Sequence, residues 1–295
     1  MIVEYRSKSK QEEQSPELYN ELRSAHARRC LAMEIAEILQ EPARQFRSSV
    51  TTDEDVESAG SRLRRDLGVS IPDQTASDNR DDHRSLRLWR TAVENCGVLV
   101  FQMKGVSTGL TRGFSIPGDV YPVIALNPGD ALNGRVFTLL HEYVHLALHS
   151  GGLCGGEGGG VEAFCDRVAG SVLLPREPLL KSVAAVGPLD AAAVGRLARQ
   201  YGVSEFALVT RLRSLGKVSQ KEYEEHASRL RLRRGSVERE SSGGPSHYRV
   251  QVSRLGRPFI SLVVHAFERD ALSQRDLGAA LNIRVSHLDK LLENM

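Results

Sequence analysis

The stretch VFTLLHEYVHLALHS, residues 136–150, decides how the rest of this 295-residue chain is interpreted. Apolar residues flank the polar HEYVH segment on both sides at helical spacing, which predicts one helix over Val136–Ser150. His141 and His145 are four residues apart, so their imidazoles project from the same helix face and can reach one metal ion. Glu142 follows on a neighbouring face, where it can act as a general base beside the ion. The stretch therefore predicts a zinc site of the HExxH type.

A catalytic zinc site needs a third protein ligand, and the sequence offers several candidates. His149 continues the spacing, but the drift of a straight helix carries its imidazole away, so we expect it at the helix end or on the substrate side. Gly151 stands where metzincins have a further histidine, which excludes that class. A following helix, Val161–Leu174, offers Glu162, whereas Glu157 lies within the glycine-rich GGLCGGEGGG. Glu162 is preferred because a helix holds its carboxylate in place.

Other residues near the expected ligands could support or complete the same site. Asp166 lies one helical turn after Glu162 and could hydrogen-bond a ligating histidine, although a solvated helix charge is the alternative. We expect Asp166 and His149 around the ligands rather than among them. Cys154 and Cys165 are conceivable soft ligands, but two histidines and a carboxylate already complete a site. Both cysteines are therefore interpreted as ordinary thiols.

Composition narrows the class of protein. Hydrophobic residues make up 41% of the chain, and 39 basic residues against 37 acidic ones leave a net charge of +2, which gives no whole-molecule case for nucleic acid as the main partner. Four cysteines without a CxxC pair give little support to a disulfide framework. The start of the chain lacks a signal-peptide core, and no apolar run approaches the roughly 18 residues that span a bilayer. We expect a cytoplasmic protein without a membrane partner.

The pattern along the chain predicts an α+β fold in three stretches. Residues 1–75 are expected to form an N-terminal helical region, 76–180 a zincin-like core, and 181–295 a helical region with helix-turn-helix-like segments. Expected helices outside the site are Pro16–Gln45, Asp53–Leu67 and Ser85–Asn95, and expected strands are GVLVFQMKG, RGFSIP and YPVIALN. Linkers or loops are expected at SIPDQTASDNRDD and SVERESSGGPSHYRV. The core thus combines a small mixed sheet with the HExxH helix and the glutamate helix, and YPVIALN is the expected edge for an extended substrate.

From about Val56 to Pro175 the sequence resembles the ImmA/IrrE metallopeptidases. The matching segments are SRLRRDLG, LWRTAVENCGVLVFQ, RGFSIP, YPVIALN, RVFTLLHEYVH and VEAFCDRVAGSVLLP. The resemblance implies Glu162 as the third ligand and places Asp166 at the family's Asn or Asp position. The chain departs from the family's usual residues at Tyr143, Val144, Cys165 and Val168.

The resemblance also implies an activity, a cofactor and a partner. It implies a Zn²⁺-dependent endopeptidase that cuts one regulatory protein, a helix-turn-helix transcriptional repressor, and so induces phage-element or stress-response genes. The alternative is a DNA- or protein-binding regulator or antitoxin-type protein with a structural or vestigial zinc site. In that case, the helices from Ala191 to Leu215 and from Leu272 to Leu292 would bind the DNA or protein partner. The run Arg229–Arg234 could contact phosphates, although a solvated helical face is the commoner meaning of such a run.

Overall fold

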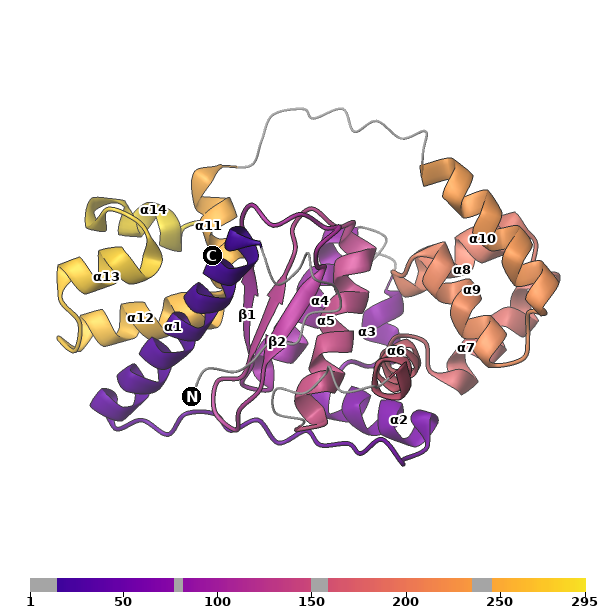
Figure 1. Cartoon of the computed structure of the whole chain (residues 1–295), viewed down its shortest axis with the longest axis horizontal. Coiled ribbons are helices and arrows are strands. Elements are labelled where there is room, and N and C mark those ends of the chain that lie inside the picture. Colours follow the sequence, from indigo (N-terminus) through magenta and orange to yellow (C-terminus); the bar gives the residue numbers. More distant parts are fainter. Residues whose placement is uncertain (1–14, 77–81, 150–158, 235–245) are drawn as a thin grey trace.

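A three-stranded sheet lies between two groups of helices in the computed structural model (Figure 1), which describes residues 15–76, 82–149, 159–234 and 246–295. The strands are β1 (Leu99–Gln102), β2 (Gly113–Ile116) and β3 (Val123–Leu126). Their order is β1-β3-β2, with β1 parallel and β2 antiparallel to β3. The predicted α+β fold with a small mixed sheet is confirmed. The expectation that YPVIALN is an edge was wrong, because β1 and β2 pair with opposite sides of β3.

The helices before the sheet differ from the predicted ones mainly at their ends. They are α1 (Pro16–Leu39), α2 (Val56–Leu67), α3 (Ile71–Thr75) and α4 (Asp82–Asn95). The first helix ends at Leu39 instead of Gln45, because Gln40 adopts a left-handed conformation and Pro42 cannot continue a helix. Part of the predicted linker forms α3, which Ser70 and Asp73 start with a reciprocal capping box.

Most of the chain after the sheet is helical. The helices are α5 (Leu132–Ala147), α6 (Gly159–Leu173), α7 (Arg176–Val186), α8 (Ala191–Tyr201), α9 (Glu205–Ser214), α10 (Gln220–Arg234), α11 (His247–Leu255), α12 (Arg257–Glu268), α13 (Gln274–Leu281), the 3-10 turn η3 (Val285–His287) and α14 (Leu288–Leu292). Ser204 caps α9 as expected, since its hydroxyl accepts the Ala207 N–H at 3.1 Å. The end of the second predicted linker is helical, because Ser246 caps α11. Among the described residues, no helix is both long and apolar enough to cross a membrane.

Both faces of the sheet are covered by helices. Alternating side chains divide between two apolar clusters: Val100, Ile124 and Leu126 face α4, α5 and α6, whereas Phe101, Phe114, Ile116, Val123 and Ala125 face α1 and α12. All four residues of β3 are buried, as a central strand covered on both faces requires. The first and last parts of the chain thus meet on the face opposite the HExxH helix. The predicted boundaries at residues 75 and 180 stay a prediction.

The two edges of the sheet have different surroundings. On the β1 edge, the Arg90 guanidinium donates to the Val100 carbonyl at 2.6 Å. The junction of α11 and α12 lies against the same carbonyl, so closely that a Cβ on Gly256 would be 2.7 Å from it. The opposite edge is β2, which lies beside α5. The β1 edge is thus occupied by contacts from α4 and the α11–α12 junction, whereas on β2 the Gly113 carbonyl accepts the Thr111 hydroxyl at 2.7 Å.

A buried arginine joins three helices behind the site. Arg211 of α9 donates to Glu57 of α2 at 2.7 Å and to the Leu174 carbonyl at 3.0 Å, and its guanidinium lies 3.3 Å from the Ser171 hydroxyl of α6. Burial raises the pKa of Glu57, but Arg211 and Ser171 outweigh it and hold that pKa below its ordinary value. The second helix of the predicted helix-turn-helix is thereby fastened to the core.

We expect Arg211→Ala to lower the free energy of unfolding by roughly 2–4 kcal/mol, because it removes a charged hydrogen bond and leaves Glu57 without its cation. Urea unfolding followed by circular dichroism measures the change. Arg196→Ala, at an exposed position of α8, is the matched control and should change stability by less than about 0.5 kcal/mol. Equal stability of the two variants would show that the Arg211 contacts contribute nothing net.

Candidate active site

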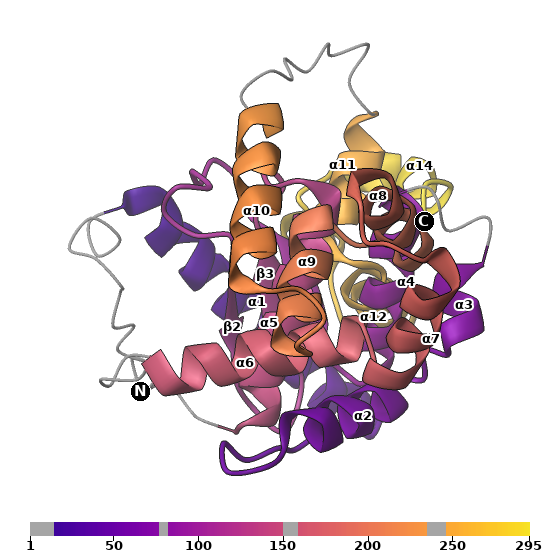
Figure 2. The same cartoon turned by 90° about the vertical axis from the view of Figure 1, so that its right-hand side faces the viewer.

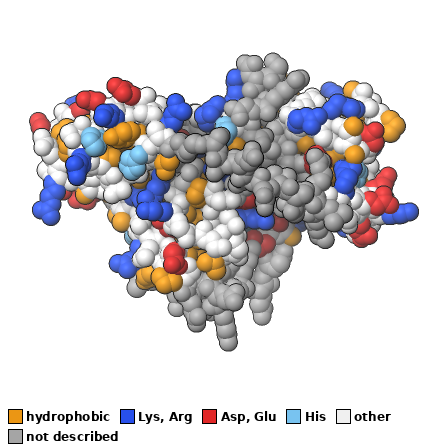
Figure 3. All heavy atoms as spheres, turned by 90° about the horizontal axis from the view of Figure 1, so that it is seen from above, with side chains coloured by type: hydrophobic (Ala, Val, Ile, Leu, Met, Phe, Trp, Pro, Cys, Tyr) orange, Lys and Arg blue, Asp and Glu red, His pale blue; other side chains and the backbone are white. Residues whose placement is uncertain are grey.

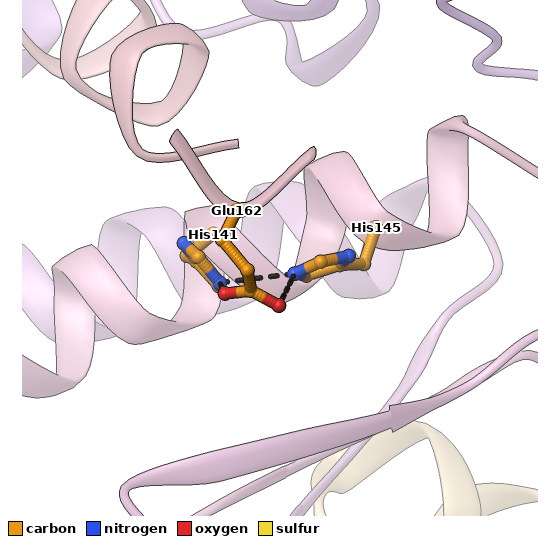
Figure 4. Close-up of side chains that lie close together, drawn as sticks. All are labelled: His141, His145 and Glu162. Atoms are coloured by element: carbon orange, nitrogen blue, oxygen red, sulfur yellow. Dashed lines mark hydrogen bonds and ion pairs between the residues drawn. The ribbon is translucent and has the colours of Figure 1, made fainter. Parts of the chain in front are cut away.

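Three side chains from two helices converge on one point (Figure 4). His141 and His145 come from α5, and Glu162 comes from the first turn of α6, which crosses α5 (Figure 2). The two histidine Nε2 atoms are 3.0 Å apart. Glu162 places one carboxylate oxygen 3.5 Å from His141 Nε2 and the other 3.6 Å from His145 Nε2. The structure therefore brings together the two histidines and the glutamate that the sequence singled out.

The spacing of these donor atoms fits one metal ion. Ligands bound at 2.0–2.2 Å around a tetrahedral ion lie about 3.3–3.6 Å from each other. The two histidine nitrogens are 3.0 Å apart, and each lies 3.5 or 3.6 Å from its nearer Glu162 oxygen, close to that range. Two imidazole nitrogens and one carboxylate oxygen also form a donor set that suits a catalytic zinc site with one position left for water. The group could thus hold a divalent ion without rearrangement of either helix.

Negative charge around His141 favours a cation at this point. Asp166 Oδ1 lies 2.8 Å from His141 Nδ1, on the side of the ring opposite the other ligands. Burial alone would lower the pKa of His141, but contacts with Asp166 and Glu162 outweigh it and raise the pKa of His141 to about 10. A divalent ion at Nε2 would supply the positive charge in place of the proton. Asp166 lies where a carboxylate orients a ligating imidazole.

The second histidine has a different neighbour. Cys165, fully buried on α6, places its Sγ 3.6 Å from His145 Nδ1. The two imidazoles are therefore contacted from behind by a carboxylate in one case and a thiol in the other. Sequence reasoning took Cys165 as an ordinary thiol and missed this contact. The signal that could have found it is its spacing of three residues from Glu162, which puts both on one side of the helix.

Glu142 lies beside the metal-binding group and is held from the sheet. It is not one of the three converging ligands, as expected for a base. The Ser115 hydroxyl of β2 donates to Glu142 Oε2 at 2.7 Å. Sequence reasoning missed Ser115, although the alternation in RGFSIP puts Gly113 and Ser115 on one face of the strand and Phe114 and Ile116 on the other.

Two contacts fix α5 in the position that the site requires. On its far side, the buried Tyr143 hydroxyl lies 2.6 Å from the Ser48 hydroxyl, which in turn donates to Asp66 at 2.8 Å. On its near side, Gly113 lets β2 approach closely, because a Cβ there would lie 2.5 Å from the stiff Thr138 side chain. The tyrosine that departs from the family pattern thus ties the HExxH helix to the segment before α2.

Two other candidates are not part of the group. His149 has a left-handed backbone, and its ring lies 4.0 Å from Asp119 and beside Phe46, so the structure does not bring it to the ligands. Its expected role around the ligands has no support in these contacts. Glu157 and Cys154 lie outside the described residues. None of the cysteines in the described segments, Cys30, Cys96 and Cys165, is in a disulfide.

The crossed helices on a small mixed sheet define a zincin-like core with a site able to bind a metal ion. Residues 93–213 match the sequence model of a peptidase family, M78, described as the IrrE N-terminal-like domain. The resemblance to the ImmA/IrrE family is thereby confirmed over these residues, which include every residue of the metal-binding group and Glu142. The match supports a peptidase, and more narrowly a metallopeptidase. A search of curated proteins finds no match to the chain.

We expect the metal-free protein to bind one divalent ion per chain, measured by elemental analysis after dialysis. At a free metal concentration about 100-fold above Kd, binding should add about 2.7 kcal/mol to the free energy of unfolding. Substituting alanine for His141, His145 or Glu162 should abolish this gain, and Asp166→Asn should weaken binding about 10- to 100-fold. His149→Ala, two residues beyond the end of the same helix, is the matched control. A loss of metal in that variant equal to the loss in His145→Ala would contradict the ligand set.

Proposed function

We propose that the protein is a zinc-dependent endopeptidase. The observation that carries this proposal is the convergence of His141, His145 and Glu162 beside the carboxylate of Glu142, within a segment that matches a peptidase family. A structural zinc site would be closed by four protein ligands. The described residues offer three, the number of protein ligands in catalytic zinc sites.

Each residue then has a distinct task. His141, His145 and Glu162 hold the ion, and Asp166 orients the His141 ring through its Nδ1. A bound zinc ion supplies Lewis acidity, which polarises the carbonyl of the peptide bond. Glu142 accepts the proton of the attacking water and passes it to the leaving amine. Ser115 occupies one carboxylate oxygen of Glu142, so the other is available for these proton transfers.

The substrate is proposed to add to β2 as an extended strand, in place of the edge expected from YPVIALN. The Asn127 N–H donates to the Arg112 carbonyl, so Phe114 and Ala125, two residues further along each strand, form the next hydrogen-bonded pair with β3. The backbone groups of Gly113 and Ser115 are consequently directed away from β3. A peptide paired there would run past the Glu142 carboxylate.

The proposed substrate is a helix-turn-helix transcriptional repressor whose cleavage induces phage-element or stress-response genes. The family resemblance supports this choice. Pairing with β2 adds a requirement, since the cut segment must be extended and accessible in the substrate. Linkers between repressor domains meet that requirement better than packed helices.

The charges and contacts give the alternative, a DNA-binding regulator, less support. The second helix of the α8–α9 pair buries Arg211 against the core, and Arg229 lies 3.7 Å from Glu205. In and directly after α14, the acidic Asp289 and Glu293 are exposed together with Lys290. Seen from above, the described side chains at both ends of the molecule include basic and acidic groups rather than basic ones alone (Figure 3). Phosphate binding favours a continuous basic surface.

We expect the zinc-loaded protein to cut the repressor encoded beside its gene, and Glu142→Gln to lower kcat at least about 100-fold because the general base is lost. Mass spectrometry of the products measures both rate and cut site. Metal content should be equal in the two proteins. His149→Ala, with wild-type cleavage, controls for the loss of a histidine close to the end of α5. Equal cleavage by wild type and Glu142→Gln would reject the base, and gel-shift binding of DNA without cleavage would favour the regulator.

Pairing with β2 can be tested with synthetic peptides that span the cut site and carry one backbone N-methyl group each. A methyl group on an amide that pairs with Gly113 or Ser115 should raise KM roughly fivefold, because about 1 kcal/mol of hydrogen bonding is lost. Methylation of the amides between them should have a smaller effect, since neighbouring amides of a strand point in opposite directions. A uniform effect along the peptide would contradict strand addition.

A further inference from the structure

We propose that Ser115 is a positioning residue that holds the Glu142 carboxylate in the orientation needed for proton transfer and links it to the strand on which the substrate docks. The hydroxyl of Ser115 donates to Glu142 Oε2 at 2.7 Å across the interface of β2 and α5. The two residues are 27 positions apart in the chain, so this is a tertiary contact and not a local helix interaction.

The close approach of β2 to α5 makes the contact possible. A Cβ on Gly113 would lie 2.5 Å from Thr138 Cγ2 and 3.6 Å from Glu142 Cγ. Gly113 therefore lets the strand lie directly over the turn of α5 that carries Glu142. Ser115 is on the same face of β2, two residues further along, and its short side chain reaches the carboxylate at that distance.

A carboxylate accepts hydrogen bonds at two oxygens, and its end rotates readily because the last torsion of glutamate is broad. A hydroxyl on Oε2 restricts that rotation and leaves Oε1 directed elsewhere. In the metal-binding group, Glu162 supplies the carboxylate that bridges the two histidines, so Glu142 has to be kept apart from those ligands. The hydrogen bond from Ser115 of β2 holds the Glu142 carboxylate apart from the ligands.

Ser115 also connects two parts of the reaction. Its side chain faces Glu142, whereas its backbone N–H and C=O point away from β3, toward the side where a substrate strand is proposed to pair. The same residue thus contacts the base through its hydroxyl and the substrate through its backbone. Movement of β2 on substrate binding would be transmitted to the Glu142 carboxylate over a single side chain.

The matched substitutions are Ser115→Thr and Ser115→Val, which have the same shape and the same preference for a strand but differ in the hydroxyl. With the repressor as substrate, we expect Ser115→Thr to stay within about threefold of wild-type kcat. Ser115→Val should lose about 10- to 100-fold in kcat, a share of what a positioned general base contributes, with KM changed less than about twofold. Zinc content should be equal in all three proteins. Equal kcat in the two variants, or a loss confined to KM, would overturn the positioning role.

Because Glu142 is a base only if the protein is the proposed peptidase, a second measurement is independent of activity. Crystal structures of the two variants should show the Glu142 carboxylate hydrogen-bonded to the threonine hydroxyl and turned away from the valine. An identical carboxylate orientation in both would overturn the proposal even if the protein cuts the repressor. The expected difference, with no cleavage by any variant, would preserve the Ser115 contact and reject the peptidase function instead.

Discussion

The crossing of α5 and α6 is the constraint on which the rest of the structure depends. Three donor atoms can share one ion only if they lie within a few ångströms of each other, and two of them belong to α5 while the third belongs to α6. A small rotation of either helix would separate Glu162 from the histidines. The crossing is fixed from outside the site, by α2 and α9 behind α6 and by β2 in front of α5. The buried Arg211 is remote from the metal-binding group, but it helps to position Glu162 because it hydrogen-bonds to the end of α6.

The ends of the chain determine which edge of the sheet remains for a partner. The first helix and the pair α11–α12 cover the face opposite the site, and the junction at Gly256 lies against the outer carbonyl of β1. A small sheet with two open edges would invite pairing on either side. With β1 covered, the proposed pairing falls to β2, the strand in contact with the Glu142 helix. In the proposed peptidase, these distant helical segments would contribute to selectivity by covering β1, without touching the substrate.

Much of this core could be predicted from sequence, and the failures have identifiable physical causes. The spacing of His141 and His145 and the helical setting of Glu162 predicted the three residues that the structure brings together, because local helix geometry determines which side chains share a face. The central place of YPVIALN was missed, since strand order depends on which long-range pairings form and periodicity carries no information about it. Ser115 and the Cys165 contact were missed for the same reason. Each is a tertiary contact, so spacing indicates the face on which the residue lies but does not by itself establish its partner.

The double role proposed for β2 limits what the enzyme can cut. If the substrate has to become the next strand, it must present several consecutive residues in extended form, and a folded repressor does so only in a linker or a locally unfolded segment. Strand pairing itself uses backbone hydrogen bonds and depends little on the side-chain sequence of the substrate. Selectivity would then come from which proteins expose such a segment close to the site, and from contacts outside it.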